Sequence, residues 1–454
     1  MATYVYRTPG STFTGEKFTF SGWFKRGDLS ARNCMLWASS DGGSADFTEI
    51  EFKADGTLHW GNKPSGGTNM QLVTNRVFRD PAAWYHLVFT WDTTLSAGDR
   101  AKIYVNGVEE TSFSTDSNAG SGETGCSLAT SGVEVDIGKQ TGSTNYYYGE
   151  MSHLHLCIGY AYAASDFGSF DSTSGIWKIK TSPSVTYGNN GFFLKFEDRT
   201  NLDLDSSPNA HTFTTTGTIT PTYDNPSNNF ATLNLLDGNI INSGGLLNGG
   251  TTYNKSTTGA GYNTTCLSTL AVSSGKWYWE SKMADASAIV SGFMNTDHGA
   301  YNGNWNLFNV NANDGWGWYG TNGTRYVGTT ATTSYFNTFT TNDIISFALD
   351  LDNGKCYAAK NGVWENSGDP TSGATGTGSF ADITTASTFF LTPALTNNNY
   401  AVASKVYYNF GNGYFGDTAV SSAEADDAGI GAMEYDVPAG YYCLCTKNIK
   451  AYGG

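Results

Sequence analysis

Two glutamates that alternate along one predicted strand are the first residues whose spacing could support chemistry. Glu49 and Glu51 lie two positions apart in the run Glu49-Ile50-Glu51-Phe52-Lys53, and residues two apart on a strand share one face of a sheet. Paired carboxylates on one face could act as general acid and nucleophile on a glycosidic bond. The alternative is a solvated strand face, with Ile50 and Phe52 directed into the core.

A second candidate is the acidic run from Asp203 to Asn209, in which Asp203, Asp205, Ser207 and Asn209 alternate with other residues. Ca²⁺ takes oxygen ligands from such clusters, but the run lacks the turn glycine and the bidentate glutamate of an EF-hand loop. A polar turn closed by side-chain to backbone hydrogen bonds is therefore favoured. A Ca²⁺ site that includes Asp203 and Asp205 stays open as the alternative, and no other cofactor is predicted.

Three histidines, His86, His153 and His155, lie within predicted strands. A Ser/His/Asp triad would be expected beside a Gly-x-Ser-x-Gly turn, and the sequence contains no such motif. We therefore expect half-exposed strand histidines without a catalytic role.

Aromatic residues in loops rich in Gly, Ser, Thr and Asn are the predicted ligand-binding residues. Such rings can stack on sugar rings, and Tyr and Trp also anchor protein interfaces. The alternative, that alternate members point into the core, stays open for Trp316 and Trp318. The predicted binding residues are Tyr146, Tyr147, Tyr148, Tyr301, Trp305 and Trp316.

The composition describes a folded chain with a neutral polar surface. The chain has 454 residues, which predicts two or three domains. Charged residues make up 15% and aromatic residues 14% of the chain, the reverse of a disordered composition. The net charge is −16 without a Lys/Arg cluster, which argues against nucleic acid and anionic membranes as partners. No apolar run is long enough to insert into a membrane.

Seven cysteines, an odd number, show neither a CxxC pair nor a Cys/His set with zinc spacing. Several lie in apolar strand patterns, so we predict buried free thiols and folding in a reducing cytoplasm. The N-terminal sequence does not have the pattern of a signal peptide. A surface rich in Ser, Thr, Asn and Gly, typical of proteins exposed outside cells, on a chain made in the cytoplasm suggests a phage virion protein.

Short strand patterns follow one another from residue 16 to about residue 162 without amphipathic helices between them. This spacing is typical of a sandwich or jelly roll. Asp55-Gly56 and Asn106-Gly107 predict tight turns. The predicted strands include 17–24, 49–53, 57–60, 84–91, 101–105, 133–138 and 149–158.

The ordered segments GWFKR, EIEFKADGTLHW, WYHLVFTWD, AKIYVNGVE, VDIGKQ and YYYGEMSHLHL resemble a laminin-G-like, concanavalin A-like lectin domain over about residues 10–165. The resemblance implies a sandwich from a family of lectins, adhesion modules and some glycosidases. Glucanases of this fold carry a Glu-x-Asp-x-(x)-Glu strand, whereas Lys53 stands here where a further acid would be needed. The resemblance therefore implies binding without catalysis.

Residues 166–235 are predicted to be a connector that packs on the first domain. It holds a helical turn near Ser165-Asp166 and a strand at 191–196. The segment 223–234 resembles a linker of tailed-phage structural proteins, where it joins a lectin-like module to a second β-domain. That resemblance implies a virion component.

The motifs GKWYWE and DIISFALDLDNGKCYAAKNGVW resemble a SPRY domain over about residues 260–412. The resemblance implies a bent antiparallel sandwich that binds protein or peptide through loops at one end. We place this domain at 236–415, after a first domain at 1–165, and predict a C-terminal strand and tail at 416–454.

The sequence thus predicts an all-β chain of two antiparallel sandwiches that binds rather than catalyses. The preferred function is a phage virion surface protein, of tail-fibre, receptor-binding or head-decoration type, located in the virion. Its expected partners are other virion proteins, further copies in a homo-oligomer such as a trimer, and a host-surface glycan or protein. A glycan-degrading enzyme and a bacterial surface adhesin are the alternatives.

Overall fold

The computed structural model describes residues 3–42, 46–124, 126–234, 244–255, 264–286, 288–297, 308, 315–383, 390–399 and 401–453. The chain divides into two compact units, Met1–Pro221 and Thr222–Gly454. Both consist mainly of antiparallel strands, which confirms the predicted all-β class. Neither α-helix within the described residues has the length and apolar character needed to cross a membrane.

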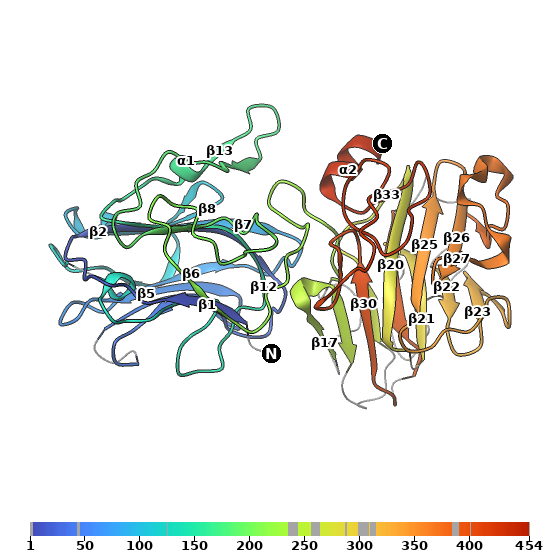
Figure 1. Cartoon of the computed structure of the whole chain (residues 1–454), viewed down its shortest axis with the longest axis horizontal. Helices are drawn as coiled ribbons and strands as arrows, with labels where there is room; N and C mark the ends of the chain where they lie inside the picture. Colours follow the sequence, from blue (N-terminus) through green and yellow to red (C-terminus); the bar gives the residue numbers. More distant parts are fainter. Residues whose placement is uncertain are drawn as a thin grey trace. The chain divides into compact units, whose positions relative to one another are not determined.

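The first unit is a sandwich of two sheets, which Figure 1 shows as stacked layers. One sheet has the order β10-β6-β5-β4-β3-β11-β1-β16 and the other the order β15-β12-β2-β7-β8-β9. The bounds are β1 Tyr4–Arg7, β2 Lys17–Arg26, β3 Asn33–Ala38, β4 Phe47–Phe52, β5 Thr57–Lys63, β6 Met70–Val77, β7 Trp84–Asp92, β8 Ala101–Val105, β9 Val108–Glu110, β10 Phe113–Ser117, β11 Val135–Ile137, β12 Gly149–Ile158, β15 Phe192–Leu194 and β16 Thr214–Thr216.

Alternating side chains build the core between these two sheets. Ile50, Leu58, Trp60 and Phe89 are all fully buried there. The Asn-Gly turn between β8 and β9 has positive φ at both residues, 48° at Asn106 and 81° at Gly107, as a tight hairpin turn requires. The alternating pattern therefore locates these strands and the side chains that fill the core between the two sheets.

The segment after β12 belongs to the first unit as far as Pro221. It contains helix α1 (Ala164–Phe167), the hairpin of β13 (Gly168–Phe170) and β14 (Trp177–Ile179), and β15 at the sheet edge beside β12. The strand predicted at 191–196 is shorter: it spans Phe192–Leu194 and ends ahead of Phe196, whose φ of 59° is not that of a strand.

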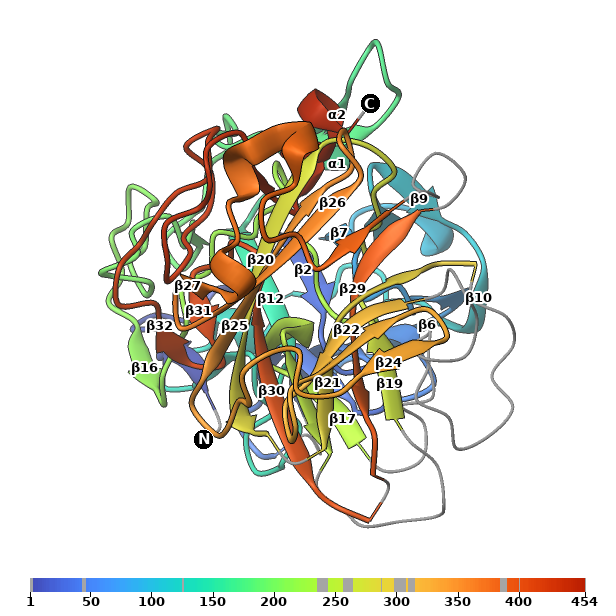
Figure 2. The same cartoon turned by 90° about the vertical axis from the view of Figure 1, so that its right-hand side faces the viewer.

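The second unit has two sheets of its own (Figure 2). The larger has the order β17-β18-β30-β20-β25-β26-β27, with β28 beside β26 and β33 beside β20, and the smaller the order β19-β29-β21-β22-β23-β24. The bounds are β17 Gly244–Leu247, β18 Thr252–Lys255, β19 Thr264–Leu267, β20 Lys276–Asp285, β21 Ile289–Asn295, β22 Gly315–Tyr319, β23 Thr324–Val327, β24 Thr330–Thr332, β25 Ile344–Asp350, β26 Lys355–Lys360, β27 Val363–Trp364, β28 Ala381–Asp382, β29 Leu391–Asn397, β30 Ser404–Asn409, β31 Tyr414–Phe415, β32 Thr418–Ala419 and β33 Tyr442–Cys443.

The C-terminal segment packs on the outer face of the larger sheet of the second unit. β33 pairs with β20, and helix α2 (Thr446–Tyr452) follows it. Met433 and Tyr441 join Tyr278 and Tyr357 in one buried cluster, together with Phe230 from the segment expected to be a linker. Residues 222–234 therefore belong to the second unit, and the division of the chain lies at Pro221 and Thr222 rather than near residue 235.

Candidate functional site

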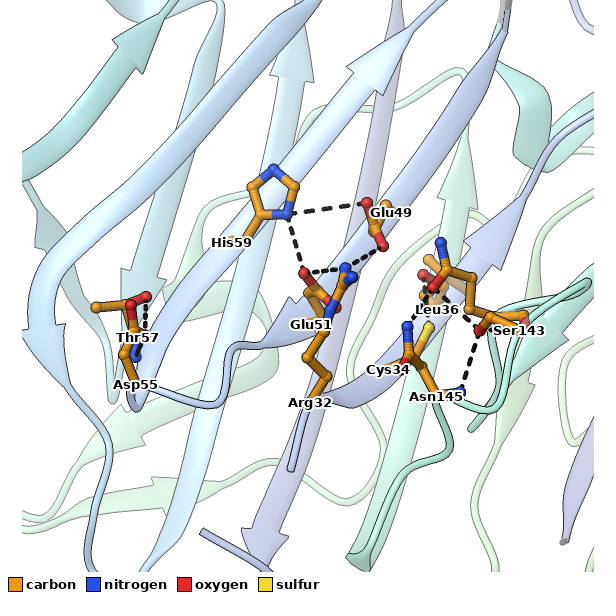
Figure 3. Close-up of polar contacts among 11 residues, drawn as sticks. Arg32, Cys34, Leu36, Glu49, Glu51, Asp55, Thr57, His59, Ser143 and Asn145 are labelled. Carbon is orange, nitrogen blue, oxygen red and sulfur yellow. Dashed lines mark hydrogen bonds and ion pairs between the residues drawn. The ribbon is translucent and has the colours of Figure 1, made fainter. Parts of the chain in front are cut away.

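The residues of the first unit that come closest to a chemical site lie on β4 and β5. Glu49, Glu51 and His59 project from the face of their sheet opposite the core, because their neighbours Ile50 and Leu58 fill the core. In the register of the sheet, Glu51 lies opposite His59 and Glu49 opposite Gly61. The strands thus place two carboxylates and an imidazole side by side (Figure 3).

Arg32, just before β3, joins both glutamates. Its Nε donates to Glu51 Oε2 at 2.7 Å, and its Nη2 donates to Glu51 Oε1 at 2.6 Å and to Glu49 Oε1 at 3.1 Å. His59 Nδ1 lies 3.3 Å from Glu51 Oε1 and 3.9 Å from Glu49 Oε2. We call Arg32, Glu49, Glu51 and His59 the charged cluster.

Burial and charge move the pKa values of the two glutamates apart. Glu49 and Glu51 are only 8% and 1% exposed, so the expected solvated strand face is wrong. Burial, and then the charge of Glu51, raise the pKa of Glu49. Burial alone would also raise the pKa of Glu51, but hydrogen bonds from His59 and Arg32 outweigh it and lower that pKa. Glu51 is therefore held as a carboxylate.

The charged cluster has residue types that could bind a metal ion or cleave a glycosidic bond, but its internal contacts oppose both. One ligand atom each of Glu49, Glu51 and His59 lie within 4.8 Å of one another, a spacing that could hold a metal ion. Arg32 already supplies the positive charge between the carboxylates, so a cation would have to displace it. The same contacts occupy the lone pairs that a catalytic nucleophile would need.

His86 is buried, contrary to the half-exposed position expected for it. The indole nitrogen of Trp177 donates to His86 Nδ1 at 3.0 Å, and Nε2 lies 2.9 Å from Ser21 Oγ. Because an indole can only donate, Nδ1 is an acceptor and the ring is neutral. Burial lowers its pKa to about 3. In a catalytic triad, the ring nitrogen of the histidine that does not face the serine would bond to a carboxylate. In His86 that nitrogen, Nδ1, accepts from an indole instead, so the arrangement does not fit a triad.

His153 and His155 are also buried, at 7% and 2% exposure, so the expectation of half-exposure is wrong for them too. His155 stacks on Phe193 with ring centroids 3.9 Å apart, and its Nδ1 lies 3.1 Å from the hydroxyl of Tyr187. Burial lowers the pKa of His153 to about 4. Both rings pack against Phe193 of β15, the neighbouring strand of the same sheet.

The three consecutive tyrosines have three different environments. Tyr147 is half-buried, and its hydroxyl donates to the carbonyl of Lys25 at 3.0 Å. Tyr146 is partly buried beside Lys139, with which it forms a β-bridge, and Tyr148 is 41% exposed. Of the three, Tyr148 has the most surface open to a ligand.

Trp316 does not have the accessible ring predicted for it. It is 3% exposed and stacks on Phe293 with ring centroids 5.3 Å apart. Trp318, on the same face of β22, is fully buried as well. The face of β22 that carries both residues is turned toward the core of the second unit, so the alternative interpretation applies. Tyr301 and Trp305 lie outside the described residues.

Asp205 closes a turn, as the favoured interpretation of the acidic run requires. It is 4% exposed and accepts backbone hydrogen bonds from Phe193, Ser207 and His211 at 2.8–2.9 Å. Asp203 accepts a hydrogen bond from the hydroxyl of Thr215 at 2.8 Å. Three backbone donors occupy the carboxylate of Asp205, which leaves it poorly suited to a cation.

The seven cysteines all lie among the described residues, and each is a buried free thiol, as predicted. Burial raises the pKa of Cys126 to about 12, so this thiol stays protonated at neutral pH.

Comparison with protein families assigns the two units. Residues 2–157 match the family described as the concanavalin A-like lectin/glucanases superfamily, and residues 276–399 match the SPRY domain. The chain therefore contains a concanavalin A-like domain followed by a SPRY domain. No curated protein sequence matches it.

Solved structures with similarity to the chain include SPRY-type domains and a pentraxin. The SPRY domain of human HERC1 is 16% identical and matches 39% of this chain and 96% of its own, with a TM-score of 0.28. The SAP-like pentraxin of Limulus polyphemus, a heptamer, is 18% identical over 42% of this chain and 88% of its own, with a TM-score of 0.29. The TRIM65 PSpry domain is 12% identical over 39% and 91%, also with a TM-score of 0.29.

The concanavalin A-like and SPRY domains suggest a role in binding and recognition.

The sequence predicted Glu49 and Glu51 as a candidate pair but did not predict Arg32 and His59, which complete the charged cluster. His59 could have been found from the Asp55-Gly56 turn, which pairs β4 with β5 and sets His59 opposite Glu51. Arg32 gives no such signal, because it lies in an irregular segment before β3.

Proposed function

We propose that this chain is a non-catalytic recognition protein. The observation that carries the proposal is the bidentate contact of Arg32 with Glu51, extended to Glu49. It engages the carboxylate pair that a glycosidase of this fold class would need, so the concanavalin A-like domain is left with a binding role. The SPRY domain supplies a second binding unit.

The test is an assay of turnover on polysaccharides. The purified chain should release no new reducing ends from neutral or acidic polysaccharides, and Glu51→Gln should give the same result. A rate above background that is lost in Glu51→Gln would overturn the non-catalytic role and establish the glycan-degrading alternative.

The finer part of the proposal places the chain on a phage virion, where it binds a host glycan, a host protein or neighbouring subunits. The support is the segment 223–234, which resembles a tailed-phage linker, together with a neutral polar surface. Mass spectrometry of purified particles should detect the chain in a fixed copy number. Its absence from particles of the phage that encodes it would refute this placement and leave the recognition role standing.

A further inference from the structure

A hollow of about 520 Å³ lies in the segment of the first unit that follows the matched family residues. Its walls come from two stretches, 182–187 and 193–208. Every residue that lines it lies beyond residue 157, where the family match ends. The volume is within the range of small-molecule sites.

The floor of the hollow rests on two buried aromatic residues, Tyr187 and Phe193, which are 8% and 5% exposed. Phe193 and Tyr187 lie nearly parallel, with ring centroids 6.2 Å apart and an interplanar angle of 10°. His155, opposite Phe193 on the neighbouring strand β12, stacks on the Phe193 ring. The backbone nitrogen of Phe193 donates to Asp205 at 2.9 Å, so the turn described above fixes this floor. Leu204, 45% exposed, adds an apolar wall.

The rim of the hollow is polar and nearly balanced in charge. Lys195 pairs with Glu197 at 2.7 Å. Asp198 accepts two hydrogen bonds from Thr200, both on the same carboxylate oxygen. The side chains of Ser182, Asn201 and Ser206 also line the hollow, and none of them forms a hydrogen bond within the described part of the chain. The rim therefore offers donors and acceptors without a strong net charge.

Phe196 is strained at the edge of this hollow. Its φ of 59° is a backbone conformation that bulky side chains rarely adopt, because it is sterically unfavourable for them. His153, which lies 3.5 Å from Glu197, has a φ of 52°. Two non-glycine residues thus have a positive φ, one in the lining of the hollow and one beside it. The shape of the hollow is therefore maintained at a cost in backbone strain. Such strain gathers at ligand-binding sites.

We propose that this hollow binds one ring of a neutral saccharide. A sugar ring has an apolar face, which fits the exposed Leu204 and the partly buried Phe196, and hydroxyl edges, which fit the polar groups of Asp198 and Asn201. An anionic ligand would meet Glu197 and Asp198, and a cationic ligand would meet Lys195, so a neutral ligand fits best. The inference rests on the proposed recognition function and names its ligand class and its place.

The test uses the full chain on an array of immobilised neutral oligosaccharides of glucose, galactose, mannose and N-acetylglucosamine. Any trisaccharide that binds is then titrated in solution by calorimetry. Asn201→Ala should weaken binding at least tenfold, since it removes an amide from the rim. The matched control is Asn69→Ala, another exposed asparagine outside the hollow, which should leave the dissociation constant unchanged.

Three outcomes separate this inference from the proposed function. Binding that Asn201→Ala weakens and Asn69→Ala does not supports the hollow as the saccharide site. Binding that neither variant changes refutes the hollow but leaves recognition by another surface. If the array shows no binding while the chain still captures intact host cells, the saccharide inference fails and the recognition function survives. Failure in both assays contradicts the proposed function as well.

Discussion

Two buried glutamates, one in each unit, show how the kind of partner decides the behaviour of a carboxylate. Glu51 in the first unit forms hydrogen bonds with His59 and with the guanidinium of Arg32, and these lower its pKa in spite of its burial. Glu280 on β20 of the second unit is fully buried, and burial raises its pKa to about 7 even though four donors bond to it. At Glu280 hydrogen bonds from uncharged groups offset burial only in part, whereas at Glu51 His59 and the cation of Arg32 together reverse its effect on the pKa.

The four donors to Glu280 come from three parts of the second unit. Tyr278 and the backbone nitrogen of Tyr435 donate to Oε1, both at 3.0 Å. Asn409 and the backbone nitrogen of Glu434 donate to Oε2, at 3.2 and 2.8 Å. Glu280 thus fastens the C-terminal segment to the outer face of its sheet. No cation bonds to it among the described residues.

The largest expected effect is the pH dependence of Glu280. Because burial raises the pKa of Glu280 from its ordinary value of 4.5 to about 7 in the folded chain, the folded state keeps the proton over this range. Its stabilising contribution is complete below pH 4.5 and is lost as the pH rises through 7. Relative to Glu280→Gln, the wild type should therefore gain on the order of 3 kcal/mol between pH 7.5 and pH 4.5.

Hydrogen exchange in peptides of β20 and β30, followed over this pH range, measures the difference. Peptides from the first unit serve as the internal control, because the two units need not unfold together. If the difference between wild type and Glu280→Gln does not vary with pH, the raised pKa of Glu280 is wrong.

Arg32→Ala tests the opposite partner. It leaves Glu51 buried without its cation, and loss of one partner of a buried pair is strongly destabilising. The side chain of Arg32 is 41% exposed, so water screens part of the effect, and we expect a loss of about 2 kcal/mol. Adding Glu51→Gln should restore much of it. Urea unfolding measures both, with Lys178→Ala, an exposed ion-pair residue, expected to cause no measurable change.

Arg32→Gln should make the first site resemble the second. An amide keeps hydrogen bonds to Glu51 but removes the charge, so the pKa of Glu51 should rise above its ordinary value, as that of Glu280 does. The loss of stability at neutral pH should be about 1 kcal/mol, less than for Arg32→Ala. NMR titration of the Glu51 carboxyl carbon measures the pKa directly. A pKa that stays below 4.5 would mean that His59 alone suffices to hold Glu51 ionised.

The sequence predicted the strands far better than it predicted the sites. Alternating patterns located strands such as 101–105 and 149–158 at their observed bounds. A pattern of period two cannot tell whether the second face of a strand is covered by other parts of the chain. The predicted exposure of Trp316 and Glu51 was therefore wrong. Both faces of their strands are buried. Arg32 and Asn201 lie in irregular segments, whose tertiary contacts leave no local pattern.

The hollow near Phe193 differs from both glutamate sites, because its polar groups are open and its backbone is strained. Phe196→Asn tests what that strain is for, since asparagine tolerates a φ near 60° better than phenylalanine does. Relief of strain should offset the lost apolar contacts, so the free energy of unfolding should change by less than about 1 kcal/mol. Saccharide binding should nevertheless weaken severalfold, because the ring that borders the hollow is gone. A variant that is equally stable and binds as well as the wild type would show that the conformation of Phe196 is a feature of the fold alone.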